Sequence, residues 1–200
     1  MENVREHSKV KLGIAVFTSP GAAFEEINRR GLLGTGLVII ALTGLVAAVP
    51  AVIAAATGDD ARWLSIGRAN PITWLGLCML YAFAMQKLLK WVGSKVEYVP
   101  LLTLMGWSQL SLLIAQIATI GLTYGQISGS QNGALVSAAI AASLLFSLWY
   151  AYLMGPAVNV LCGSPVARGI LTYIVIEVAA MIGFSSTYGS ARMSNYEHAL

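Results

Sequence analysis

The sequence contains seventy consecutive residues, Tyr98 to Ala167, without a single Asp, Glu, Lys or Arg. A membrane-spanning helix needs about 20 predominantly apolar residues, so this stretch is long enough for two spans and a loop. The whole chain is 57% hydrophobic and only 10% charged, whereas about a quarter of the residues in a soluble domain are charged. We therefore expect an integral membrane protein rather than a soluble helical domain.

Five apolar runs along the chain predict an all-α membrane protein, a bundle of five transmembrane helices. Several begin beside a proline, as at Asn70-Pro71 and Ser164-Pro165, and proline favours the first turn of a helix. The membrane domain covers residues 32–190, and a short polar tail follows at 191–200. The spans are expected at about residues 33–56, 72–89, 100–124, 134–158 and 168–188.

Residues 1–31 form a charged arm ahead of the first span. Ser19-Pro20 within it is a helix-start signal, with serine as the N-cap and proline at the first helical position. The residues that follow combine a short apolar face with charges, which is typical of a helix that lies in the headgroup layer on its apolar side. We expect a short amphipathic cytosolic helix here. Its candidate contact residues for a partner protein are Pro20, Phe24, Glu25 and Ile27.

Lys and Arg are distributed unequally between the two sides of the predicted bundle. The arm, the loop from Lys87 to Lys95 and Arg168 together carry nine, and the opposite side carries three. Because basic residues concentrate on the cytoplasmic side of a membrane protein, we expect the N-terminus in the cytoplasm and the C-terminus outside. The first apolar run is much longer than the core of a signal peptide, so it should remain in the mature protein.

The third span is the most polar of the five. Gln109, Gln116, Thr119 and Thr123 are separated by seven, three and four residues, which places them on one face of a helix. In hydrocarbon such side chains seek hydrogen-bond partners on neighbouring helices, so we expect this helix to be central in the bundle. Two interpretations of the face stay open, namely polar contacts between helices and a hydrated path for a substrate.

Glu177, in the fifth run, is the one Asp, Glu, Lys or Arg inside an apolar run of this chain. By the helical rise, Glu177 and Gln109 lie at similar depths, roughly 12 to 14 Å from the inner ends of their helices. We predict that Glu177 faces the third span, with Gln109 or Ser108 as its partner. A carboxyl at this depth must be neutral, paired or next to water, so it is either a structural contact or a proton or cation site. The candidate polar cluster comprises Glu177, Gln109, Ser108 and Gln116.

The sequence lacks motifs for catalysis, cofactors and metals. His7 and His198 fall on opposite sides of the predicted membrane, and Cys78 and Cys162 lack metal-ligand spacing. No HExxH, GxSxG or glycine-rich phosphate loop occurs. The basic residues form no continuous stripe of the kind that binds nucleic acid. We expect neither an enzyme nor a protein that depends on a cofactor or binds nucleic acid.

Two segments resemble the Yip1-domain family of membrane proteins. Residues 17–27, Phe-Thr-Ser-Pro-Gly-Ala-Ala-Phe-Glu-Glu-Ile, are similar to the first segment of many bacterial members, and Gly106-Trp107-Ser108 resembles their glycine-aromatic-small opening of the third span. Many members carry a proline a few residues later, where this chain has Gln109-Leu110-Ser111. The sequence therefore leaves open whether the third helix kinks at that point. The resemblance implies a five-span bundle with a cytosolic N-terminus and no established catalytic residues.

The short arm resembles that of the bacterial branch, some of whose members work beside ABC-type exporters or in envelope stress. The resemblance therefore implies a non-enzymatic accessory or scaffold protein of the bacterial cytoplasmic (inner) membrane, assisting export, membrane trafficking or an envelope-stress complex. The Rab GTPase binding of eukaryotic relatives is not implied. The expected partners are the lipid bilayer and other membrane proteins, either an ABC-type transporter or further copies of this chain. The alternative is a small permease or lipid-moving protein that uses the region of Gln109, Gln116 and Glu177.

Overall fold

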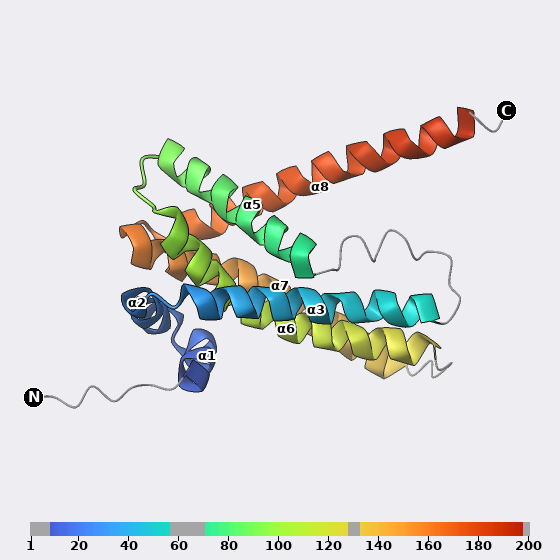
Figure 1. Cartoon of the computed structure of the whole chain (residues 1–200), viewed down its shortest axis with the longest axis horizontal. Coiled ribbons are helices and arrows are strands. Elements are labelled where there is room, and N and C mark those ends of the chain that lie inside the picture. Colours follow the sequence, from blue (N-terminus) through green and yellow to red (C-terminus); the bar gives the residue numbers. More distant parts are fainter. Residues whose placement is uncertain (1–8, 57–70, 128–132, 198–200) are drawn as a thin grey trace, which may run out of the picture.

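The computed structural model describes residues 9–56, 71–127 and 133–197, and this part of the chain contains helices and no strand. Two short helices come first and five long helices follow, as Figure 1 shows. The helices are α1 (Lys9–Thr18), α2 (Pro20–Arg30), α3 (Leu33–Ala56), α5 (Pro71–Trp91), α6 (Tyr98–Ile127), α7 (Gly133–Cys162) and α8 (Val166–Glu197).

Four of the described helices are long and apolar enough to cross a membrane. They are α3 over Leu33–Pro50, α5 over Pro71–Trp91, α6 over Tyr98–Gly121 and α7 over Gly133–Cys162. Each contains one of the first four predicted spans, and α3 has the predicted bounds. The other three helices extend a few residues beyond the prediction, because helical hydrogen bonding continues past the apolar run that marks a span. In α7 the helix also continues through Pro156.

The fifth predicted span, residues 168–188, lies within α8 but α8 is not among these four helices. The structure describes the side chains of α8 only as far as Ile182, and the sequence after that residue is richer in serine and glycine than the other runs. The described part of the chain therefore has four candidate spans rather than the expected five.

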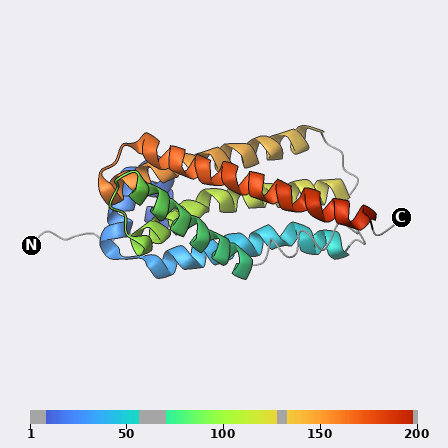
Figure 2. The same ribbon diagram turned by 90° about the horizontal axis from the view of Figure 1, so that it is seen from above.

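The helix α6 lies at the centre of the bundle. It contacts α3, α5 and α7 as well as α1 and α2, and Figures 1 and 2 show α3 running alongside it. Leu101, Leu104 and Met105 in its first half are at most 1% exposed. The expectation that the third span is central is confirmed.

The helices α7 and α8 are joined by a tight connection at Gly163, whose φ of 63° is a backbone conformation that favours glycine. A methyl group on Gly155 of α7 would lie 2.7 Å from the carbonyl oxygen of Val166, and one on Gly169 would meet the carbonyl oxygen of Met154. The two backbones therefore touch near the connection, as small residues allow in membrane proteins. Toward its C-terminal end α8 diverges from the other helices (Figure 1).

The arm packs on the bundle instead of lying apart from it. Phe24 and Ile27 of α2 are 0% exposed, and α2 contacts both α6 and α7. The prediction that the apolar side of this helix faces the headgroup layer is therefore wrong, because protein covers that side. The sequence also gave no separate prediction for α1, whose Phe17 ring lies edge-on to Phe146 of α7 at a centroid distance of 6.5 Å.

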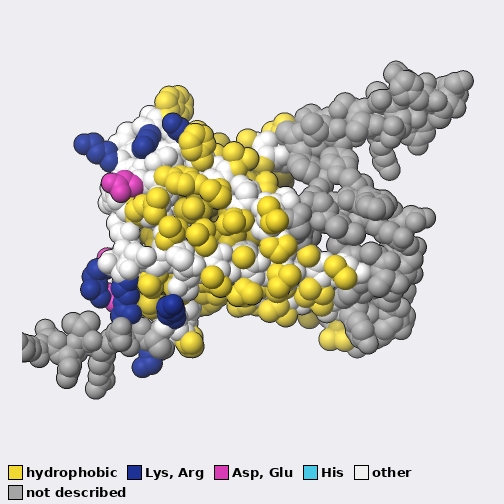
Figure 3. All heavy atoms as spheres, in the orientation of Figure 1, with side chains coloured by type: hydrophobic (Ala, Val, Ile, Leu, Met, Phe, Trp, Pro, Cys, Tyr) yellow, Lys and Arg dark blue, Asp and Glu magenta, His cyan; other side chains and the backbone are white. Residues whose placement is uncertain are grey.

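Charged and apolar side chains separate on the surface. Figure 3 shows an apolar belt over the middle of the described part of the molecule, and Lys, Arg, Asp and Glu side chains at its left end. Exposed side chains at that end come from the arm and from the α5–α6 connection, and they include Glu25, Arg29, Lys90, Lys95 and Glu97. This distribution is typical of a protein embedded in a bilayer.

Candidate functional site

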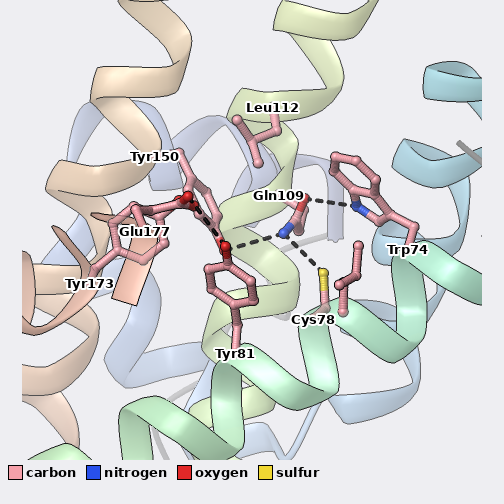
Figure 4. Close-up of a pocket in the computed structure, with 9 residues that line it drawn as sticks. Trp74, Cys78, Tyr81, Gln109, Leu112, Tyr150, Tyr173 and Glu177 are labelled. Atoms are coloured by element: carbon pink, nitrogen blue, oxygen red, sulfur yellow. Dashed lines mark hydrogen bonds between the residues drawn. The ribbon is translucent and has the colours of Figure 1, made fainter. Parts of the chain in front are cut away.

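A cavity of about 210 Å³ lies between α5, α6, α7 and α8. Figure 4 shows its walls, which combine aromatic rings with an amide, a thiol and one carboxyl group. The lining residues are Trp74, Leu77, Cys78, Tyr81, Gln109, Leu112, Tyr150, Tyr173 and Glu177.

Helical periodicity explains why these side chains converge. Trp74, Cys78 and Tyr81 are separated by four and three residues, so they lie along one face of α5. Tyr173 and Glu177 of α8 are separated by four residues and share a face in the same way. Because α6 is central, its Gln109 side chain points into the space between these faces (Figure 4).

Glu177 accepts hydrogen bonds from two phenols. The hydroxyl of Tyr81 on α5 donates to Oε2 at 3.3 Å, and the hydroxyl of Tyr173, one turn earlier on α8, donates to Oε1. Among the described residues, neither Gln109 nor Ser108 hydrogen-bonds to Glu177, so the predicted pairing is wrong, although Glu177 faces the cavity that Gln109 also lines. Ser108 is fully buried and its hydroxyl donates to the carbonyl oxygen of Leu104 at 2.9 Å within α6.

Gln109 connects three helices instead. Its Oε1 accepts from the indole N–H of Trp74 at 3.4 Å, and its Nε2 donates to Tyr150 Oη at 3.2 Å and to Cys78 Sγ at 3.3 Å. The side chain is 2% exposed, and both ends of the amide have partners. Gln109 therefore holds α5 and α7 against α6, which is the polar contact between helices that the sequence left as one of two interpretations.

The cavity brings two of the four predicted cluster residues together. Glu177 and Gln109 both line it, whereas Gln116 lies further along α6 and Ser108 points elsewhere. Sequence reasoning missed the aromatic members of the site. Tyr173 could have been found, because it precedes Glu177 by one helical turn, but Tyr81 and Tyr150 enter only through contacts between helices.

The groups that line the cavity can contribute to binding a ligand. Among the described residues, no group of three or more His, Cys, Asp or Glu side chains could hold a metal ion. The cavity offers aromatic faces and edges, phenol hydroxyls and one carboxylate, which are groups that can surround a cation or a polar headgroup.

A second polar cluster ties the start of α8 to the α5–α6 connection. The hydroxyls of Ser94 and Ser164 lie 3.0 Å apart and both residues are 6% exposed. Arg168 Nη1 donates to them at 3.1 and 3.3 Å. Arg168 therefore joins the α5–α6 and α7–α8 connections at the same end of the bundle.

The predicted contact residues of the arm divide into two groups. Phe24 and Ile27 are fully buried, so their side chains hold α2 on the bundle and do not reach a partner. Glu25 is exposed and Pro20 is half-buried at the start of the helix.

An ion-pair group lies beside them on α2. Glu26 forms ion pairs with Arg29 at 2.6 Å and with Arg30 at 2.5 Å. The hydrogen bonds from Arg29 and Arg30 lower the pKa of Glu26 to about 2, so this carboxylate stays ionised at neutral pH.

Comparison with known families gives one match. The family model described as the Yip1 domain matches residues 14–187, which includes most of the arm helices and every helix that lines the cavity. The resemblance to the Yip1-domain family is thereby confirmed. No curated protein and no solved structure matched the chain.

Proposed function

The chain belongs to the Yip1-domain family, and from this premise we propose that it is a non-enzymatic accessory or scaffold protein of the bacterial inner membrane. One observation carries the proposal. Phe24 and Ile27 fix α2 on the bundle, so the exposed Glu25 and Arg29 belong to a surface of fixed shape and not to a mobile tail. Pre-ordered surfaces bind partners at lower entropic cost.

The neighbouring charges extend this surface. Lys90 at the end of α5, and Lys95 and Glu97 in the α5–α6 connection, are exposed. Figure 1 shows this connection at the same end of the bundle as α2. Mixed charges of this kind steer and select a partner more than they add raw affinity. The partner we propose is another membrane protein, an ABC-type transporter or a second copy of this chain, that meets the arm on the cytosolic side.

Affinity purification of the detergent-solubilised chain, followed by mass spectrometry, tests this role. Arg29→Glu reverses one exposed charge on α2 and should reduce recovery of the partner several-fold. Lys90→Glu makes the same change of charge at the end of α5, in the part of the proposed surface outside α2, and should also reduce recovery of the partner. If both variants and the unaltered chain recover the same proteins in the same amounts, or if the chain is recovered alone, the scaffold proposal is wrong.

The proposal includes a topology of five spans, with the N-terminus in the cytoplasm and the C-terminus outside. It is supported by the basic residues at the arm end, and by the length of α8, which from Val166 to Glu197 extends for roughly 48 Å at the usual rise. Labelling single cysteines with a membrane-impermeant reagent in whole cells checks it, in a chain with Cys78 and Cys162 replaced by serine. A cysteine at position 196 should react from outside and one at position 25 should not.

The cavity favours a second candidate function, a small permease or lipid-moving protein. The observation is that Gln109 and Glu177 line a single space inside the membrane domain. Reconstitution in vesicles distinguishes the two roles, because Glu177→Gln should abolish proton-linked flux in a permease and leave partner recovery unchanged in a scaffold. Equal flux in the unaltered and Glu177→Gln proteins would remove this candidate.

A further inference from the structure

The cavity between α5 and α8 is small and has aromatic walls. Its volume of about 210 Å³ is below the roughly 300 Å³ at which pockets for drug-sized ligands begin. Rings from three helices meet around it in different planes. Tyr150 and Tyr173 lie edge to face with centroids 5.2 Å apart, and the Tyr81 ring is tilted by 42° to that of Tyr173 at 6.5 Å.

Glu177 supplies the charge of the cavity. Of the described residues that line it, Glu177 is the one with an acidic or basic side chain. The phenols of Tyr81 and Tyr173 donate to its two oxygens, so both oxygens of the carboxyl group act as hydrogen-bond acceptors at the cavity. A carboxylate at membrane depth favours a cationic partner, and aromatic rings, whose faces attract cations, line the space next to it.

The other polar groups narrow the class of cation. The amide of Gln109 is bonded to Trp74, Tyr150 and Cys78, so its single oxygen already accepts a hydrogen bond from Trp74. Calcium takes about six to eight oxygen ligands, and magnesium is held by one or two carboxylates together with several waters. The lining of this cavity is mostly aromatic and apolar and has one carboxyl group, so it is a poor match to either ion. An alkylated ammonium group needs no such ligand shell, because ring faces and one negative charge are sufficient.

We propose that this cavity binds a small organic ammonium group, with the Glu177 carboxylate as its counter-ion and Trp74, Tyr81, Tyr150 and Tyr173 as its aromatic walls. The group belongs either to a soluble amine or to a phospholipid headgroup. The site is independent of the accessory role, because its residues lie inside the bundle and the proposed partner surface lies on α2.

Isothermal titration of the full-length protein in a maltoside detergent tests the site. Choline is the charged probe, and 3,3-dimethylbutanol is its uncharged counterpart of the same shape. Choline should bind saturably and the alcohol should bind at least about tenfold more weakly. This comparison uses the unaltered chain, so it does not depend on any variant folding. Equal binding of the two probes, or no binding of choline, overturns the proposal.

Single-residue variants then test which side chains contribute to choline binding. Glu177→Gln should weaken choline binding about tenfold or more, whereas Glu97→Gln, which removes an exposed carboxylate in the α5–α6 connection, should leave it unchanged. Tyr150→Phe keeps the ring and should bind choline, and Tyr150→Leu removes the ring and should bind it several-fold more weakly. Size-exclusion chromatography and circular dichroism confirm that each variant is folded. A folded Glu177→Gln protein with unaltered affinity overturns the assignment of the counter-ion.

The two sources of the ammonium group are separated in nanodiscs. In phosphatidylcholine discs a headgroup that occupies the cavity competes with free choline, so the apparent affinity should fall relative to phosphatidylglycerol discs. A fall supports a lipid headgroup as the occupant, and equal affinities support a soluble amine. Partner recovery by Glu177→Gln, measured separately, distinguishes failure of this site from failure of the accessory role.

Discussion

A methyl group on Gly106 of α6 would lie 2.7 Å from the carbonyl oxygen of Gly36 in α3, because the two helix backbones touch where they cross. Trp107, the next residue, is 1% exposed and its indole N–H lies 3.5 Å from the carbonyl oxygen of Leu32. The Gly106-Trp107-Ser108 segment, through which the sequence resembles the Yip1-domain family, therefore forms the α3–α6 crossing. Its physical role is close packing.

Replacing Gly106 with alanine should destabilise the protein by about 1 to 3 kcal/mol, because the added methyl forces the backbones apart. Unfolding in mixed micelles of dodecyl sulfate, followed by circular dichroism, measures the effect. Gly121→Ala in the same helix is the control, since a methyl group there would meet nothing within 4 Å. Alanine is the better helix former, so the control should be neutral or slightly stabilising. Similar losses of stability for Gly106→Ala and Gly121→Ala would contradict a close contact between the α3 and α6 backbones at Gly106.

The hydrogen bond between Tyr81 and Glu177 should couple α5 to α8. A double-mutant cycle with Tyr81→Phe and Glu177→Gln should give a coupling free energy of about 0.5 to 2 kcal/mol, the usual range for hydrogen bonds between membrane helices. Tyr98→Phe is the control partner, because the hydroxyl of Tyr98 donates to the carbonyl oxygen of Met79 and not to Glu177. Its coupling with Glu177→Gln should be close to zero. Equal coupling in both cycles would argue against a direct contact.

Low pH should weaken the ion pairs of α2. Arg29 and Arg30 lower the pKa of Glu26 to about 2 in the folded protein, whereas a glutamate in an unfolded chain has a pKa of about 4.3. The pairs therefore favour the folded state above pH 4.3, and their contribution is lost as the pH falls toward 2. The difference in melting temperature between the unaltered chain and Glu26→Gln should be small at pH 7 and should shrink across this window. A difference in melting temperature that does not change with pH would show that the ion pairs of Glu26 do not stabilise the folded state.

Trp149 and Trp107 should respond differently to replacement by phenylalanine. The indole N–H of Trp149 is buried and has no hydrogen-bond partner, so Trp149→Phe removes an unsatisfied donor and should cost little or stabilise by up to about 1 kcal/mol. Trp107→Phe loses both packing at the α3–α6 crossing and the bond to Leu32, so it should destabilise by about 1 to 3 kcal/mol. The same unfolding measurement compares the two variants. A larger loss of stability for Trp149→Phe than for Trp107→Phe would contradict the roles given to the two indole N–H groups.

The positions of the helices along the chain follow closely from the sequence. The bounds of α3 agree with the predicted 33–56, and Pro20 and Pro71 begin α2 and α5 as expected. These features are local, because the length of an apolar run and the φ angle of proline act within a few residues. The departure in α7 is its extension from the predicted end at residue 158 to Cys162, where the helix still packs against its neighbours.

The sequence pattern of α2 does not show whether its apolar side meets lipid or protein. An apolar helix face is equally satisfied by lipid and by protein, because both remove it from water. The sequence therefore predicted an amphipathic helix correctly but assigned its apolar side to the headgroup layer. Contacts of Phe24 and Ile27 with the bundle, which join residues far apart in sequence, decided between the two.

For the candidate site, the sequence by itself determined that Glu177 and Gln109 lie at similar depths in an apolar bundle, since depth depends only on the rise per residue. The tertiary structure decided which side chains they meet. From Gly169 to Ile182, α8 is apolar on all sides apart from Thr172, Tyr173 and Glu177, so its sequence pattern does not fix its rotation about its own axis. Its backbone contact with α7 at Gly155 and Gly169 sets that rotation and turns Glu177 toward Tyr81 of α5.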